Sequence, residues 1–93
     1  MREEYFAKVP VRMLSDENIK STSVRVYLAL DSFADNKTRV CYPSINSLAE
    51  KLNINRRTVI RSLNELIENG YVRKSKRSSK NNGGYISNVY HLS

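Results

Sequence analysis

Two short helical patterns lie only three residues apart in residues 44–70, and this spacing restricts the fold more than any other feature of the chain. Apolar residues of the first pattern recur at i, i+3, i+4 and i+7, as in an amphipathic helix: Ile45, Leu48, Ala49 and Leu52. Residues 53–55 (NIN) interrupt that pattern, and asparagine tolerates the left-handed backbone of a sharp turn. The pair therefore indicates a helix-turn-helix unit over residues 44–69.

The second helix carries signals at both of its ends. Asn55 is a favourable N-cap, and Gly70 follows Asn69 in the position of a C′ glycine. Tyr71 can then reach back to Leu66, as in a Schellman motif. Four apolar residues of this helix are predicted to face inward, with Ile60 at their margin: Val59, Leu63, Leu66 and Ile67.

The remaining segments predict a third helix and a small sheet. A helix is expected over 23–35, with Ser21, Thr22 or Ser23 as its cap, and a short strand over 38–42. Residues 5–14 are interpreted as an extended arm or short strand, and 15–20 as a connector. After Gly70 the pattern predicts strands at 71–76 and 85–92 around a polar loop at 77–84.

These elements define one α+β domain over residues 1–93, a winged helix-turn-helix with three helices and a small antiparallel β-sheet. Residues 1–20 form its N-terminal arm, 44–69 its helix-turn-helix and 71–92 its wing hairpin. The arm is long for a lead-in and is a candidate for homodimer formation.

Positive charge is concentrated in the second part of the chain. The net charge is +7, divided as −1 over residues 1–36 and +8 over residues 37–93. Such asymmetry indicates a face that meets a polyanion, with nucleic acid expected before an anionic membrane. A basic protein without such a partner is the alternative.

Several classes of protein are disfavoured by the residue inventory. One cysteine (Cys41) and one histidine (His91) cannot supply a zinc site of the usual type, and no metal or other cofactor is expected. No nucleophile with its base and no phosphate-binding glycine loop is evident, so neither an enzyme nor a small-molecule ligand is indicated. No apolar run has the length of a membrane span, and a cytoplasmic protein is expected.

The segment YPSINSLAEKLNINRRTVIRSLNELIENGYVRK, followed by a basic loop and SNVYHL, resembles a known family. It is similar to the winged helix-turn-helix domains at the N-termini of plasmid and phage replication initiators and replisome organisers. The resemblance covers about residues 5–92 and rests on the pieces PS-x₃-LA, N-x-NRRTV and L-x₂-NGY. It implies that helix 56–69 enters a DNA major groove, that loop 77–84 is the wing, and that the setting is the bacterial cytoplasm or nucleoid.

The residues agree with this implication. Two arginines at the start of a helix oppose its macrodipole, at a cost of about 0.3–1 kcal/mol each, and DNA would offset that cost. Arginine can bond guanine, and asparagine adenine, in a bidentate way. The residues expected to contact bases form one ridge opposite the apolar stripe, with the threonine beside it: Arg57, Thr58, Arg61 and Asn64. A solvated polar face is the alternative.

Phosphate contacts are expected from three further places. The start of the first helix and the turn before the second contribute Ser44, Asn46, Asn55 and Arg56. The wing, which carries five cations and no acid, contributes Lys74, Lys76, Arg77 and Lys80.

The expected function is sequence-preferring binding of double-stranded DNA in plasmid or phage replication initiation. A small transcriptional regulator on the same fold is the first alternative. A winged helix used for protein contact is the second, and RNA binding is disfavoured because an A-form major groove excludes a helix.

Overall fold

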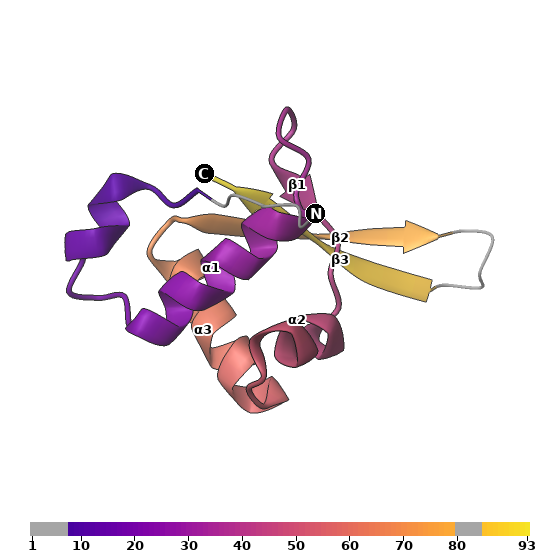
Figure 1. Ribbon diagram of the computed structural model, residues 1–93. Coiled ribbons are helices and arrows are strands. Elements are labelled where there is room, and N and C mark those ends of the chain that lie inside the picture. Colours follow the sequence, from indigo (N-terminus) through magenta and orange to yellow (C-terminus); the bar gives the residue numbers. More distant parts are fainter. Residues whose placement is uncertain (1–7, 80–84) are drawn as a thin grey trace, which may run out of the picture.

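The computed structural model describes residues 8–79 and 85–93, and its elements follow the predicted order. The elements are a 3₁₀ helix η1 (Val11–Ser15), α1 (Ser21–Phe33), β1 (Val40–Cys41), α2 (Ile45–Leu52), α3 (Arg56–Glu68), β2 (Val72–Ser79) and β3 (Tyr85–Leu92). The three α-helices lie together, and β2 and β3 run beyond them as a two-stranded ribbon (Figure 1). The predicted α+β winged helix-turn-helix is confirmed.

The turn between α2 and α3 follows the local signals in the sequence. Ser44 caps α2 by accepting a hydrogen bond from the Ser47 N–H at 3.0 Å, and Asn55 caps α3 by accepting one from the Thr58 N–H at 2.8 Å. Asn53 adopts the left-handed conformation (φ 58°, ψ 46°), as predicted for a sharp turn. Local side chains therefore fix both helix starts and the bend between them.

The end of α3 is a Schellman motif. Gly70 has φ +83°, its N–H bonds the Ile67 carbonyl at 3.1 Å, and the Tyr71 N–H bonds the Leu66 carbonyl at 2.9 Å. This end turns the chain directly into β2, so that the hairpin starts at a fixed angle to α3.

The start of α1 differs from the prediction. Its N-cap is Lys20, which makes no side-chain cap bond, and the helix runs over Ser21–Phe33 rather than 23–35. The acceptor comes from α3 instead: a Glu65 carboxylate oxygen accepts from the Lys20 N–H at 3.1 Å and from the Ser23 hydroxyl. A carboxylate at a helix N-terminus satisfies free N–H groups and complements the macrodipole. Ser23 therefore lies inside the helix as a buried donor.

The N-terminal segment also differs from the prediction. Residues 11–15 form the 3₁₀ helix η1 rather than an extended arm or strand, while residues 1–7 lie outside the described part. Met13 inserts into the core at 1% exposure, and the Arg12 guanidinium lies 4.2 Å from the centre of the Tyr71 ring. The Tyr71 hydroxyl donates to Asp16 at 2.6 Å, which lowers the pKa of that carboxyl. Contacts of Arg12 and Asp16 with Tyr71 and the burial of Met13 thus anchor the segment.

The sheet has the strand order β1-β3-β2 and is antiparallel throughout. β1 is shorter than the predicted 38–42, because Arg39 takes a positive φ of 60° before it and Pro43 follows closely after it. β2 is longer than predicted and pairs with β3 as far as Ser79 with Tyr85. The predicted loop 77–84 is therefore too long. The backbone ladder between β2 and β3 continues through these polar residues, because it is made by main-chain groups.

The core lies between the helices and the root of the sheet. Every described element except β2 contributes a side chain under 2% exposed, and β2 contributes Val72 at 3%. The largest fully buried side chains are Met13, Tyr27, Leu30, Leu48, Leu66, Tyr71 and Tyr90. The predicted stripe of α3 faces inward: Val59, Leu63 and Leu66 are buried, and Ile67 is half-buried against the core. Ile60, predicted at the margin, is 43% exposed. Burial raises the pKa of the Cys41 thiol to about 11, so the thiol is neutral at neutral pH.

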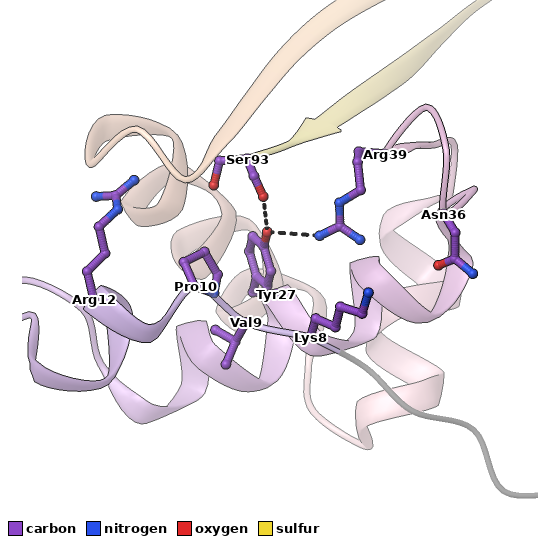
Figure 2. A pocket seen from close by; sticks show the side chains of 8 residues that line it. All are labelled: Lys8, Val9, Pro10, Arg12, Tyr27, Asn36, Arg39 and Ser93. Atoms are coloured by element: carbon purple, nitrogen blue, oxygen red, sulfur yellow. Dashed lines mark hydrogen bonds between the residues drawn. The ribbon is translucent and has the colours of Figure 1, made fainter.

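A buried carboxylate ties distant segments together behind this core. Asp31 of α1 pairs with the Arg39 guanidinium and accepts from the Lys8 N–H at 2.9 Å. Arg39 also donates to the Tyr27 hydroxyl at 3.3 Å, which in turn donates to the Ser93 main-chain oxygen at 2.9 Å (Figure 2). The chain leading into η1, α1, the turn before β1 and the end of β3 therefore meet in one hydrogen-bonded network.

Replacing Arg39 with alanine should destabilise the fold by about 3 kcal/mol, because Asp31 would remain buried without a counter-charge. The value is set at the lower end of the range for buried pairs because the Arg39 side chain is 26% exposed, against 4% for Asp31. Because alanine, like arginine, carries a Cβ, the substitution does not relieve the backbone strain at the positive φ of residue 39. Denaturant unfolding measures the change, and Lys37→Ala, an exposed cation in the same turn, is the matched control. Equal stability of the two variants would contradict the role of the pair.

Replacing Glu65 with alanine should cost about 1 kcal/mol of stability, the usual loss when a helix N-terminus loses its acceptor. Glu68→Ala is the control, because Glu68 is an exposed acid on the same helix without a partner among the described residues. Thermal unfolding of both variants gives the comparison. A loss no larger for Glu65→Ala than for Glu68→Ala would show that α1 does not depend on Glu65.

Candidate nucleic-acid interface

The outer face of α3 presents three unpaired polar side chains in a row. Arg57, Arg61 and Asn64 are exposed, and they lie opposite the buried stripe that begins at Val59. None of the three makes a hydrogen bond or ion pair with another residue in the described part of the chain. Their donors are therefore available to an external partner.

Charge along α3 is divided between its two halves. Arg56 and Arg57 occupy the first turn without any acid, and Arg61 follows one turn later. The acids Glu65 and Glu68 lie in the second half, and the carboxylate of Glu65 is committed to the start of α1. The positive potential thus belongs to the N-terminal half of α3, which is the half that reaches base edges first in helix-turn-helix proteins.

Thr58 is less accessible than predicted for a residue that contacts bases. It is half-buried and lines a cleft of about 100 Å³ between α3 and the start of α1, together with Lys20, Thr22 and Arg61. The structure therefore brings exposed Lys20 beside Arg61, a neighbour that the sequence did not reveal. The signal for it is non-local, since it depends on Glu65 holding the start of α1 against α3.

The two predicted phosphate-contacting residues at the start of α2, Ser44 and Asn46, differ in how many of their hydrogen-bonding groups remain free. The Ser44 hydroxyl accepts from the Ser47 N–H and donates to the Ser47 hydroxyl, both at 3.0 Å, so its hydrogen-bonding capacity is largely used within the helix. Asn46 is exposed and has no hydrogen-bond partner among the described residues. Asn55 likewise spends its amide oxygen on the α3 cap and retains only its NH₂ group for a phosphate.

The root of the hairpin has two distinct sides. Lys74 pairs with Tyr90 and Lys76 with Asn88, so both lysines lie on the face that Tyr90 turns toward the helices. Arg73 pairs with His91 on the opposite face. The Arg77 side chain and all of Lys80 lie outside the described residues. Of the predicted wing cations, Lys74 and Lys76 are therefore placed on the side of α3.

One cleft lies between the start of α2, the flank of α3 and the root of the hairpin. It measures about 240 Å³ and is lined by Ile45 at the start of α2, Ile60 and Asn64 of α3, and Lys74 and Asn88 of the hairpin. The start of α2, the flank of α3 and the wing root thus border the same surface.

A second hollow lies away from this surface. It measures about 450 Å³ and is lined by Lys8, Val9, Pro10, Arg12, Tyr27, Asn36, Arg39 and Ser93 (Figure 2). Among the described residues no group of His, Cys, Asp and Glu side chains is placed to hold a metal ion. No helix in residues 8–79 or 85–93 is long and apolar enough to cross a membrane.

Comparisons with known proteins agree with this geometry. A family model described as a helix-turn-helix domain matches residues 17–72, and the chain belongs to this family. A similar solved structure is described as a possible transcriptional regulator from Methanosarcina mazei Go1. It has a TM-score of 0.57 and 22% sequence identity, over 82% of this chain and 57% of that one. No curated protein gives a significant match.

Family and fold together support DNA binding by a winged helix-turn-helix domain. The chain spans a little over half the length of the Methanosarcina protein. At this level of identity the likeness concerns the fold alone. The individual contact residues and the homodimer remain predictions.

Replacing Lys74 with alanine should weaken binding to all DNA sequences alike and reduce the slope of log K against log salt by about one. Arg73→Ala is the matched control, a cation of the same strand on the opposite face, and should leave the slope unchanged. Fluorescence anisotropy over a series of salt concentrations measures both. Equal effects of the two variants would contradict the assignment of sides.

Proposed function

We propose that this domain binds double-stranded DNA with sequence preference, with α3 in the major groove. The observation that carries the proposal is the ridge of Arg57, Arg61 and Asn64, whose donors have no partner in the described part of the chain. A B-form major groove admits an α-helix and presents acceptors that these side chains match. The family match and the fold support the same surface.

Each group has a distinct part in this proposal. Arg57 and Arg61 donate to guanine O6 and N7, and Asn64 bonds the edge of an adenine. Arg56 of α3, Lys20 before α1 and Lys74 of the wing root bind phosphates, which set the position of the domain without reading sequence. The chain performs recognition without catalysis, because none of these roles involves a bond-making step.

Two biological settings are compatible with such recognition. Control of transcription is favoured by the description of the similar Methanosarcina structure as a possible transcriptional regulator. Initiation of plasmid or phage replication is favoured by the motifs that begin at Pro43 and end at Tyr71. The location of the preferred sites distinguishes them, since a regulator binds at promoters and an initiator at repeats in an origin. A homodimer in either setting would show as half-sites about 34–36 Å apart or a multiple of that distance.

The direct test is fluorescence anisotropy of a labelled random-sequence duplex at several salt concentrations. DNA binding requires that affinity fall steeply with salt, because each neutralised phosphate adds about −0.9 to the slope. Absence of binding even at low salt would refute the proposal. The basic face would then be a protein contact, which need not depend steeply on salt.

Replacing Arg61 with alanine should relax the preference for one base pair by about 1–3 kcal/mol, the discrimination that a bidentate contact provides. Competitive binding to duplexes varied at each position measures the change. Arg61→Lys keeps the charge but not the two-pronged donor, so it should lose the same preference while retaining most non-specific affinity. If Arg61→Ala weakens all sequences equally, Arg61 binds a phosphate instead.

A further inference from the structure

Ile60 is an apolar side chain on the polar side of α3. It is 43% exposed, whereas Val59 beside it is at 0% and Leu63 one turn later is at 4%. One residue of an α-helix corresponds to a rotation of about 100°, which carries Ile60 off the buried stripe. Among the described residues of α3 it is the large apolar side chain that remains exposed. The core therefore does not account for an isoleucine here.

The neighbours of Ile60 are the groups assigned to DNA recognition. Arg57 precedes it by three residues and Asn64 follows it by four, so both are its neighbours on the helix surface. On its other side Ile60 borders the cleft toward the wing root, where Lys74 and Asn88 form the polar rim. Single exposed apolar residues are common on protein surfaces. This one lies between two predicted base-reading residues and a predicted phosphate-binding lysine.

The major groove offers one apolar group that such a side chain can contact, the 5-methyl group of thymine. We propose that Ile60 is a specificity-determining residue that packs against a thymine methyl in the recognised site. The proposal rests on the proposed function, since it requires α3 to lie in the major groove. Asn64 lies about 6 Å further along the helix axis, so the thymine is expected within about two base pairs of the base that Asn64 reads.

Deoxyuridine provides a clean probe, because it retains the hydrogen-bonding edge of thymine and lacks only the methyl group. Each thymine of the preferred duplex is replaced in turn by deoxyuridine, and Kd is measured for the wild-type domain and for Ile60→Ala. Wild type should lose about threefold to fivefold in affinity at one thymine, the size expected for one methyl group returned to water. Ile60→Ala should bind the two duplexes equally.

Phe33→Ala is the matched control. Phe33 is 44% exposed on α1, against 43% for Ile60, and the Lys51 ammonium of α2 lies over its ring, 5.3 Å from the ring centre. This variant removes a similar exposed apolar area outside α3 and should keep the full thymine dependence. Because Ile60 is only partly covered, Ile60→Ala should unfold at nearly the same temperature as wild type, which circular dichroism verifies.

The outcomes separate this inference from the proposed function. Sequence-preferring binding that is indifferent to every thymine-to-deoxyuridine replacement would overturn the role of Ile60 and leave DNA recognition intact. An unchanged thymine dependence in Ile60→Ala would do the same. Failure of the wild-type domain to bind any duplex, at any salt concentration, would refute both.

Discussion

The pairing of Asp31 with Arg39 is the interaction on which the arrangement of the domain depends. It lies where α1, the turn before β1 and the end of β3 converge, and the hydroxyl of Tyr27 extends it to Ser93. A carboxylate at 4% exposure is tolerated only with a counter-charge and satisfied hydrogen bonds, so these segments are held in one relative position. The Arg39 backbone accepts the N–H of Leu92 at 2.9 Å, which attaches the sheet to the same point.

The orientation of α3 follows from restraints at its two ends and its middle. Asn55 fixes its start, the motif at Gly70 fixes its exit into β2, and Glu65 joins it to the start of α1. The ridge of Arg57, Arg61 and Asn64 is thereby presented by a rigid rod. Charge placed on such a rod needs little reorganisation when it meets a partner, and this is the benefit of building a recognition surface on a packed helix.

Sequence reasoning succeeded where the structure is determined by neighbouring residues. The caps at Ser44 and Asn55, the left-handed Asn53 and the end of α3 depend on side chains within five residues, and all were predictable. Features that depend on residues far apart in the sequence could not be predicted. The cap of α1 comes from Glu65, which is 45 residues from Lys20, and the insertion of Met13 turns the expected extended arm into a 3₁₀ helix. Which side of the hairpin each cation occupies can be assigned only from the register between β2 and β3. The exposure of Ile60 depends on how α3 packs against the other elements.

The alignment of the two strands in the outer hairpin is determined differently from that of the rest of the domain. Its backbone ladder continues to the pair Ser79–Tyr85, and the ribbon runs beyond the helices (Figure 1). The alignment is inherited from the root, where Val72 pairs with Leu92 and Lys74 with Tyr90 against the core. Variation in the outer ribbon is thereby uncoupled from folding. The domain can change the charge or length of this part, and with it the reach and strength of the wing, without altering the platform that carries it.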